Sequence, residues 1–314
     1  MTTSPELRIG SRASPLARFQ AEAVRAALAA AHPGLAAPGA IELRTIRTTG
    51  DKERDRALAE IGGKGLFTKE IEEALLAGAI DLAVHSMKDM PTWPPEGLVI
   101  AGQLAREDPR DALIANGVGA IEGLAAGAIV GTASPRRTAQ LLMRRPDLRV
   151  VLFRGNVHTR LRKLAAGEVD ATLLAVAGLK RLGMMEKAGA SALDPSVMLP
   201  AVGQGAICIE CRARDDRVRA LVAPINHAPT EIAVVCERAM LAALDGSCRT
   251  PIAGYAVLDG DGGLHLRGLV AKPDGGAAHR ASRRGPASDA AALGADVGRE
   301  LKAAAGPGFF DEAG

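Results

Sequence analysis

The chain of 314 residues is long enough for two or three domains, and its 47% hydrophobic and 24% charged residues are typical of a globular protein in water. Aromatic residues make up only 2%, and the net charge is +3 despite 39 lysines and arginines, which disfavours base stacking and a polyanion-binding surface. No stretch has the pattern of a secretory signal or the roughly 18 apolar residues of a membrane span, and four cysteines form no dense disulfide framework. These features predict a cytoplasmic protein with reduced thiols and a pocket for a small anion.

The first expected unit is a strand over 7–10 that leads into a helix. Ser14 suits the N-cap position and Pro15 suits the first helical position. The helix start would present backbone N–H groups beside Arg12, which is an arrangement that binds anions. The alternative is an ordinary capped helix with no ligand.

A second strand is expected over 40–46, followed by a charged passage and the glycine-rich segment 62–65. Lys64 is followed by glycine rather than Ser or Thr, so the segment is not a phosphate-binding loop of the Walker type. A hinged lid and a plain flexible loop both fit this composition. Thr68 is expected to cap the next helix.

Polar and titratable residues cluster where an apolar strand over 80–84 ends. His85, Ser86, Lys88 and Asp89 fall within five positions, and Pro91 ends the regular structure. Ligands of open α/β sheets bind beyond the carboxyl ends of strands. Asp89 in a cationic pocket could donate and recover a proton beside a bound anion. The alternative is a solvated loop in which the lysine and the aspartate pair.

A second strand–loop–helix unit begins with a strand over 128–130. Its loop repeats the Ala-Ser-Pro of residues 13–15 at 133–135, so a second serine-capped helix start is expected. Another strand over 150–153 ends in an arginine-rich loop. Arginine suits bidentate capture of carboxylate or phosphate. Four arginines on these two loops are therefore candidate ligands for an anion, unless they are solvated surface charges: Arg136, Arg137, Arg154 and Arg160.

The remaining chain is expected to return to the first sheet and then form a small domain. A strand over 169–176 is followed by a Pro- and Gly-rich return crossover at 194–205, and a strand over 206–210 is expected to rejoin the first sheet. A linker at 224–229 precedes a long helix, a strand over 264–270 and a helix over 287–304. This tail predicts a small α+β domain.

The four cysteines differ in their expected roles. Cys208 and Cys211 have the spacing of half a zinc site, but no second pair follows, so a metal site is disfavoured. Cys236 lies on an apolar helical stripe that includes Val235 and Met240 and is expected in the core. Cys248 lies in a loop beside Arg249, where a thiolate nucleophile is favoured over an incidental surface thiol.

Taken together, these segments resemble the porphobilinogen deaminase (hydroxymethylbilane synthase) family from about Arg8 to Tyr255. The resemblance rests on segments in the family's order: 10–17 (GSRASPLA), 62–67 (GGKGLF), 85–89 (HSMKD), 131–137 (GTASPRR), 154–156 (RGN), 199–205 (LPAVGQG) and the loop bearing Cys248. One departure is Ser247 before the cysteine, where glycine is commoner.

The resemblance implies an α/β fold with two periplasmic-binding-protein-like (type II) domains around a cleft and a small α+β C-terminal domain. Domain 1 would comprise 1–105 and 200–222, domain 2 would comprise 106–199, and domain 3 would comprise 223–314. It also implies a dipyrromethane cofactor joined by a thioether to Cys248. Four porphobilinogen molecules would be added head to tail with loss of ammonia, and water would release hydroxymethylbilane.

Roles for individual residues are carried over in the same way. Asp89 would protonate the departing amine and stabilise the azafulvene-like cation, and Lys64 and Phe67 would belong to a lid. Ten residues would hold the acetate and propionate groups of the cofactor and substrate: Arg12, Ser14, Lys88, Thr132, Ser134, Arg136, Arg137, Arg154, Arg160 and Arg181. No metal, nucleic acid or membrane partner is expected, and the protein is expected to be a monomer.

Two other classes of protein remain as alternatives. A non-catalytic receptor for a small anion on the same two-lobed fold would need the arginines but neither Cys248 nor Asp89. A basic RNA-binding protein is disfavoured by the scarcity of aromatic residues and the modest net charge.

Overall fold

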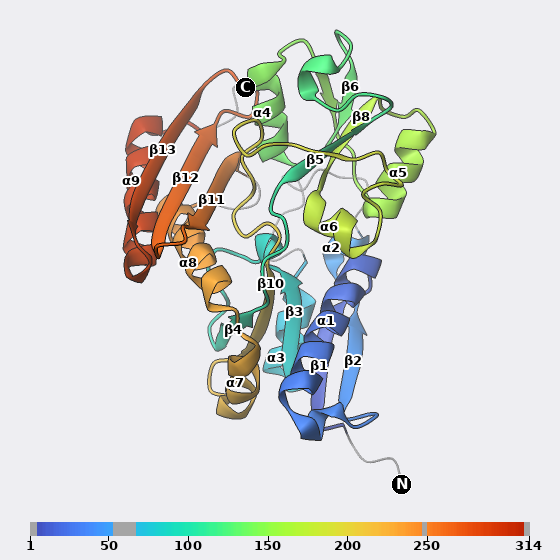
Figure 1. The fold of residues 1–314 in the computed structure, drawn as a ribbon, viewed down its shortest axis with the longest axis vertical. Helices are drawn as coiled ribbons and strands as arrows, with labels where there is room; N and C mark the ends of the chain where they lie inside the picture. The colour runs from blue at the N-terminus through green and yellow to red at the C-terminus, as the bar shows by residue number, and fades with distance from the viewer. Residues whose placement is uncertain (1–4, 53–66, 247–249, 311–314) are drawn as a thin grey trace. The chain divides into compact units, whose positions relative to one another are not determined.

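The computed structural model describes residues 5–52, 67–246 and 250–310, which form three sheets flanked by helices (Figure 1). By density of contacts the described chain separates into two compact units. Unit 1 contains residues 5–52, 67–106 and 206–231, and unit 2 contains residues 107–205, 232–246 and 250–310. The three-domain division stays a prediction; unit 2 contains nearly all of the predicted domain 2 and most of the predicted domain 3.

Unit 1 is built on a five-stranded sheet in the order β2-β1-β3-β10-β4. Its strands are β1 (Leu7–Arg12), β2 (Ile41–Ile46), β3 (Leu82–Ser86), β4 (Leu98–Gln103) and β10 (Ile207–Arg212). The first three are parallel, and β10 runs antiparallel between β3 and β4. The helices of this unit are α1 (Pro15–Ala31), α2 (Thr49–Lys52), α3 (Lys69–Leu76) and α7 (Asp216–Val222). Strand β10 therefore rejoins the first sheet, as predicted for 206–210.

Unit 2 contains a second five-stranded sheet in the order β7-β6-β8-β5-β9. Its strands are β5 (Asp111–Ala115), β6 (Ile129–Gly131), β7 (Arg149–Val151), β8 (Ala171–Ala175) and β9 (Ser191–Ala192). Helices α4 (Pro135–Arg144), α5 (Val157–Ala165) and α6 (Val176–Arg181) accompany it. Again three strands, β7, β6 and β8, are parallel, and β5 runs antiparallel beside β8. The two sheets thus share one topology, which confirms the predicted α/β class with two similar domains.

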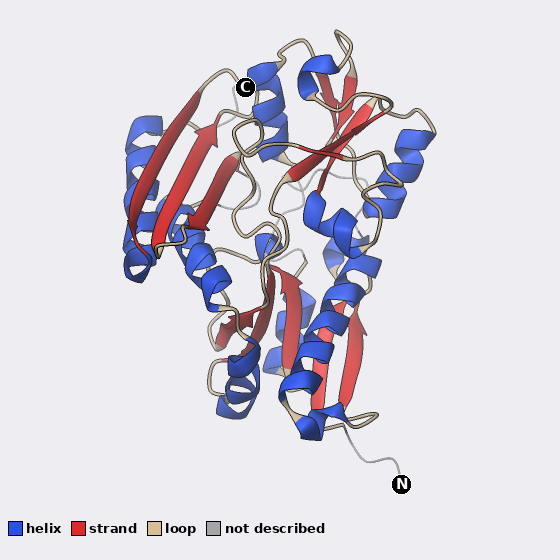
Figure 2. Ribbon diagram, viewed as in Figure 1, coloured by secondary structure: helices blue, strands red, loops and turns tan. Residues whose placement is uncertain are grey.

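The third sheet is an antiparallel meander of β11 (Ile252–Leu258), β12 (Gly263–Ala271) and β13 (Ala278–Pro286). Helix α9 (Ala290–Ala305) lies along β12 and β13, and α8 (Ala228–Ala243) contributes Cys236 and Met240 to the same core (Figure 2). The small α+β domain predicted for the tail is therefore present. No helix in the described part of the chain is both long and apolar enough to pass through a membrane.

Several local predictions need correction. The strand predicted over 80–84 begins and ends two residues later, because pairing with β10 extends it through His85 and Ser86. No strand was predicted over 98–113, yet this passage contains β4 and the start of β5, on either side of the charged residues 106–110. Val235 is 40% exposed, so its place on the apolar stripe was wrong, whereas Cys236 is fully buried as predicted. Thr68 occupies the N-cap position of α3, but its side chain makes no capping hydrogen bond.

Candidate active site

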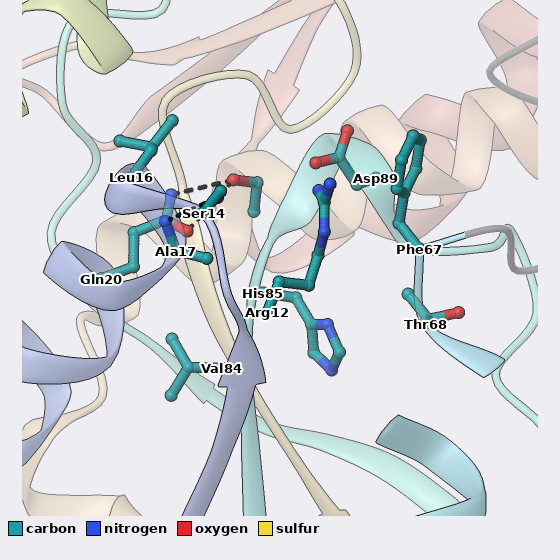
Figure 3. Close-up of a pocket in the computed structure, with 11 residues that line it drawn as sticks. Arg12, Ser14, Leu16, Ala17, Gln20, Phe67, Thr68, Val84, His85 and Asp89 are labelled. Carbon is teal, nitrogen blue, oxygen red and sulfur yellow. Dashed lines mark hydrogen bonds between the residues drawn. The ribbon is translucent and has the colours of Figure 1, made fainter. Parts of the chain in front are cut away.

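A pocket lies in unit 1 where β1 and β3 end (Figure 3). Because these two strands are parallel, their carboxyl ends meet at one edge of the sheet, which is the usual place for a ligand in an open α/β fold. The pocket brings together four residues predicted from the sequence, namely Arg12, Ser14, Phe67 and Asp89. Segments far apart in the chain thus converge on one cavity.

The start of helix α1 forms one wall of this pocket. Ser14 is the N-cap, its Oγ accepts a hydrogen bond from the Ala17 backbone N–H at 3.2 Å, and Pro15 follows as predicted. Leu16 and Ala17 of the first turn also line the cavity. The positive end of the helix dipole therefore lies at the pocket, where it favours a bound anion.

Arg12 lies across the pocket from this helix start. Its guanidinium carbon is 4.2 Å from the centre of the Phe67 ring, a cation–π contact, and Figure 3 shows the side chain extending towards Asp89. Asp89 and Lys88 are adjacent in the short 3₁₀ helix η2 (Met87–Asp89), and both are half-buried. The pocket thus combines one carboxyl group with cationic and backbone donors.

Gln20 and His85 also line the pocket, although neither was assigned a role in binding from the sequence. Gln20 is buried in α1, and its Nε2 donates to Ser86 Oγ at 2.8 Å, which holds that hydroxyl at the pocket. His85 is also buried, with Nε2 3.2 Å from the Glu210 carboxylate on β10. The signal for Gln20 was its polar side chain on the apolar face of α1, since buried polar groups need partners.

Unit 2 repeats the serine-capped helix start at α4. Ser134 Oγ accepts from the Arg137 backbone N–H at 3.5 Å, and Pro135 occupies the first turn. The Ser134 N–H donates to Thr132 Oγ1 at 3.2 Å, and Thr132 itself is buried. Thr132 and Ser134 therefore shape the loop between β6 and α4.

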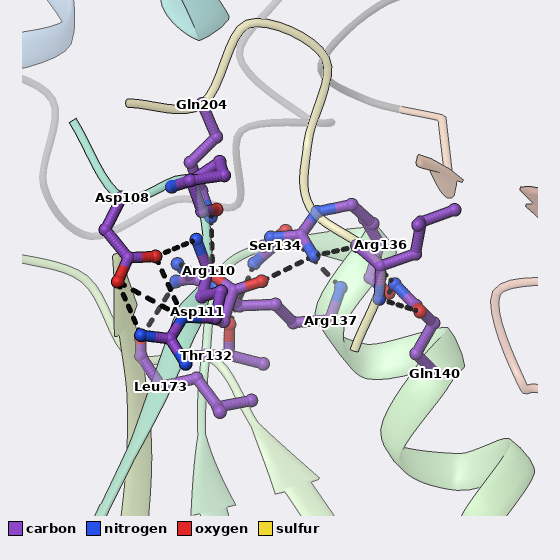
Figure 4. Close-up of polar contacts among 12 residues, drawn as sticks. Asp108, Arg110, Asp111, Thr132, Ser134, Arg136, Arg137, Gln140, Leu173 and Gln204 are labelled. Carbon is purple, nitrogen blue, oxygen red and sulfur yellow. Dashed lines mark hydrogen bonds and ion pairs between the residues drawn. The ribbon is translucent and has the colours of Figure 1, made fainter. Parts of the chain in front are cut away.

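The two arginines that open α4 are both buried against Asp111 (Figure 4). Arg136 Nη1 and Arg137 Nη2 each lie 2.7 Å from the Asp111 carboxylate. Burial alone would raise the pKa of Asp111, but the two guanidinium charges hold it well below its usual range. Some of the N–H donors of Arg136 and Arg137 therefore bind the Asp111 carboxylate and are not available to a ligand.

Arg160 and Arg154 add further positive charge near Arg137. Burial, together with the charges of Arg137 and Arg154, lowers the pKa of Arg160 to about 10, so its guanidinium stays protonated at neutral pH. Arg160 Nε donates to the Gly155 carbonyl at 2.9 Å. Among the described residues Arg160 has no ion pair. We define Arg137, Arg154 and Arg160 as the cation cluster. Three neighbouring guanidinium groups are suited to binding a carboxylate ligand.

The other predicted residues lie elsewhere. Arg181, at the end of α6, donates to the Gly205 carbonyl at 2.7 Å, and burial lowers its pKa. Lys64 and Cys248 lie outside the described residues. All three described cysteines are buried, and burial raises the pKa of Cys211 to about 11 and that of Cys236 to about 12, so neither of these two is a ready nucleophile. Within the described part of the chain, no cluster of three His, Cys, Asp or Glu side chains could hold a metal.

Comparison with known protein families identifies the family of the chain. The model "Porphobilinogen deaminase, dipyromethane cofactor binding domain" matches residues 7–220, and "Porphobilinogen deaminase, C-terminal domain" matches residues 231–303. The chain belongs to the porphobilinogen deaminase family. It is therefore an enzyme, a transferase of tetrapyrrole biosynthesis with a dipyrromethane cofactor, as the resemblance implied.

Relatives in this family are similar over nearly the whole chain. The chloroplastic porphobilinogen deaminase of Oryza sativa subsp. japonica is 56% identical over 307 residues, covering 97% of this chain and 86% of that protein. The porphobilinogen deaminase of Nitrobacter hamburgensis is 56% identical over 302 residues, covering 96% and 94%. Among solved structures, a Brucella ovis periplasmic binding protein with glutathione bound has a TM-score of 0.42 and 16% identity, covering 76% of this chain and 68% of its own.

The described residues fit the cofactor of this family. A dipyrromethane built from porphobilinogen carries several carboxylates, and the described residues offer guanidinium groups and two serine-capped helix starts that can bind carboxylates. Cys248, the attachment residue that the resemblance implies, lies outside the described residues.

Proposed function

We propose that this chain joins four porphobilinogen molecules head to tail and releases hydroxymethylbilane, with Asp89 as its acid–base residue. The observation that supports this role most strongly is the pocket in which Asp89 lies beside Arg12 and the N-terminus of α1. A single carboxyl group surrounded by donors is suited to chemistry in which an anionic substrate must lose an amine.

Asp89 gives and recovers one proton in each round. Its carboxyl group donates a proton to the aminomethyl nitrogen of porphobilinogen, the C–N bond breaks, and ammonia leaves. The resulting carboxylate stabilises the azafulvene-like cation of the substrate. After the new C–C bond forms, the α-proton of the attacked pyrrole leaves and Asp89 is protonated again. Since donation and recovery balance, the same residue serves all four rounds.

The carboxylates of the substrate are bound by arginine, lysine and hydroxyl side chains. Each porphobilinogen brings an acetate and a propionate, so binding several units requires many donors and favours bidentate guanidinium groups. We assign Arg12, Ser14 and Lys88 to this task in unit 1. In unit 2 the corresponding set is Thr132, Ser134, Arg136, Arg137, Arg154, Arg160 and Arg181.

The thiol of Cys248 is proposed as the attachment point of the cofactor, since a thiolate is a suitable nucleophile towards an electrophilic pyrrole methylene. When bound, the dipyrromethane supplies the pyrrole carbon to which the first substrate is joined. Lys64 and Phe67 are proposed to belong to a lid that limits access of water. We further propose that the enzyme is a cytoplasmic monomer, in keeping with its composition.

The test compares the parent chain with Asp89→Glu and Asp89→Asn for consumption of porphobilinogen and release of ammonia. Loss of a positioned general acid costs about 10²- to 10⁴-fold in rate, so both variants should retain the cofactor and turn over far more slowly. Asp216→Asn, at a carboxylate whose side chain is 89% exposed in the same unit, is the matched control and should behave as the parent. Unchanged turnover in Asp89→Asn would remove Asp89 from the mechanism, and binding of porphobilinogen without consumption by the parent would indicate a non-catalytic receptor.

A further inference from the structure

We propose that Asp111 is a positioning residue for the arginines of unit 2. Its buried carboxylate holds Arg136 and Arg137 so that the cation cluster is already ordered before a substrate carboxylate arrives. The inference rests on the proposed role of these arginines in binding substrate and cofactor.

The carboxylate of Asp111 is satisfied entirely by protein donors (Figure 4). Asp111 is the first residue of β5 and is 0% exposed. Its Oδ1 accepts from Arg137 Nε at 3.0 Å, from Arg137 Nη2 at 2.7 Å and from Gln204 Nε2 at 3.0 Å. Its Oδ2 accepts from Arg136 Nη1 at 2.7 Å. A group enclosed in this way does not touch substrate, so it acts only through its partners.

Arg137 is fixed on two sides and keeps donors for a ligand. Besides the two bonds to Asp111, its Nη1 donates to the Leu173 carbonyl of β8 at 2.8 Å. A guanidinium has five N–H donors, so one donor on each terminal nitrogen of Arg137 is not used by these three bonds. Because the plane of the guanidinium is set by Asp111 and Leu173, the direction of the remaining donors is set as well.

Asp111 also compensates charge. The pKa of Arg160 is lowered by burial and by Arg137 and Arg154, and the pKa of Arg136 is lowered by burial while the Asp111 charge opposes that shift. Without the carboxylate, Arg136 and Arg137 would be two adjacent buried cations with no counter-charge, and their repulsion would drive the side chains apart.

The same network fixes the segment 199–205, which carries one of the family's sequence signatures. Arg136 Nη1 donates to the Leu199 carbonyl at 2.8 Å, and Gln204 Nε2 donates to the Pro109 carbonyl at 2.7 Å in addition to Asp111. Asp111 therefore joins β5, the start of α4 and this segment at one buried point. The arginines that open α4 are held from both sides.

The test uses Asp111→Asn in the full-length holoenzyme. An asparagine keeps one acceptor oxygen but directs an NH₂ donor at one of the two guanidinium groups, so Arg136 and Arg137 can no longer both be held. We expect the KM for porphobilinogen to rise at least about tenfold, kcat to fall much less, and the fraction of chains that carry the cofactor, read by intact mass, to decrease.

The matched control is Asp108→Asn, three residues earlier. Asp108 makes the same kind of pair, with Arg110 Nε at 3.0 Å and Nη2 at 2.7 Å, but contacts neither Arg136 nor Arg137. This variant should keep the parent KM and cofactor content. An unchanged KM in Asp111→Asn, even with a lower melting temperature, would overturn the inference, because a purely structural role changes stability alone.

A second variant covers the case in which Asp111→Asn does not fold. Gln204→Met removes one neutral donor from Asp111 and leaves the charges in place, so a smaller rise in KM, roughly two- to fivefold, is expected. A parent KM in Gln204→Met would then count against the inference. Absence of porphobilinogen consumption by the parent chain would overturn the proposed function as well, and the two failures are thereby distinguished.

Discussion

The pKa values of two buried carboxyl groups of unit 1, Asp81 and Glu72, are shifted in opposite directions. Burial alone would raise the pKa of Asp81, but hydrogen bonds from the Arg8 side chain and backbone N–H hold it below its usual range. Burial also raises the pKa of Glu72, and here the nearby charge of Glu210 adds to the shift. One carboxylate thus stabilises the fold at neutral pH, whereas the other opposes it.

Replacement of Asp81 by asparagine should destabilise the protein most at neutral pH. The folded pKa of Asp81 is depressed, so its contribution is present above the unfolded pKa of about 3.9 and is lost as the pH falls through the folded pKa. We expect Asp81→Asn to cost about 1–3 kcal/mol at pH 7 and clearly less at pH 3. Thermal unfolding of both proteins at the two pH values measures this, and a gap that is constant with pH would contradict the account.

Replacement of Glu72 by glutamine should have the opposite sign. The folded pKa of Glu72 is raised, so its carboxylate destabilises the fold above that pKa and has no effect below the unfolded pKa of about 4.3. Glu72→Gln should therefore melt higher than the parent at pH 7 and equally at pH 3.5 or below. The neighbouring Glu73→Gln is the control, since the Glu73 side chain is 63% exposed and should show little change. A lower melting point for Glu72→Gln at pH 7 would be inconsistent with this reasoning.

Side chains whose partners are close in sequence were predictable, and those with distant partners were not. The caps at Ser14 and Ser134 depend on backbone groups three residues away and follow from local rules. Asp111 meets Arg136, Arg137 and Gln204 across 25, 26 and 93 positions, so only the folded sheet brings them together. For the same reason the arginines could be predicted as a set of ligands but not as partners of a buried acid.

Helices α8 and α9 pack unusually closely, and two glycines on α9 permit this. A Cβ at Gly298 would lie 2.6 Å from the Met240 carbonyl oxygen and 2.6 Å from the Ala243 Cβ, and a Cβ at Gly294 would meet the Cys236 carbonyl. The backbone of α9 therefore rests directly on α8, next to the core of the third sheet. A side chain at either position would separate the two helices.

Gly298→Ala should accordingly destabilise the protein although alanine is the better helix former. The gain in helix propensity is about 1 kcal/mol, whereas overpacking against backbone costs about 1–3 kcal/mol and cannot be relieved by rotating a side chain. The control is Gly34→Ala, where a Cβ has nothing within 4 Å and the backbone needs no positive φ. Urea or thermal unfolding should show a loss for the first variant and none for the second. Equal stability of the two would show that α8 and α9 move apart without cost.

Secondary structure was predictable where one face of an element is apolar or a cap is present, as in α1, α4 and β1. It was not predictable at 98–113, because the charged run 106–111 dominates that passage while β4 and β5 are defined by pairing with β10 and β8. Pairing also moved the end of β3 to Ser86. Strand limits depend on partners that single-sequence patterns do not contain.

The two five-stranded sheets have the same strand order. In each, three parallel strands (β2-β1-β3 in unit 1 and β7-β6-β8 in unit 2) are followed by an antiparallel strand and then by an edge strand. In unit 1 the antiparallel strand β10 arrives by the return crossover, and in unit 2 the antiparallel strand β5 arrives by the forward crossover. The arrival of β10 in the first sheet is the return of the chain that was predicted from the sequence. In each unit the first parallel strand is followed by a helix that a serine caps, Ser14 in unit 1 and Ser134 in unit 2.

The charge of the molecule is nearly balanced overall, with 39 lysines and arginines and 36 acidic residues, yet the arginines differ in their charged neighbours. Many arginines pair with acids, as Arg8 does with Asp81, whereas Arg160 has two further arginines as its charged neighbours. Composition could therefore exclude a polyanion-binding surface, but it could not identify which arginines are reserved for a small anion.

The account as a whole depends on a covalent cofactor at Cys248. Intact mass and peptide mapping of the protein purified from cells that make porphobilinogen test this directly. We expect the added mass of two linked pyrrole units on the peptide that contains Cys248, and its absence in Cys248→Ser. An unmodified peptide, with no gain in mass after incubation with porphobilinogen, would contradict the proposed reaction and leave a receptor for a small anion as the function of this fold.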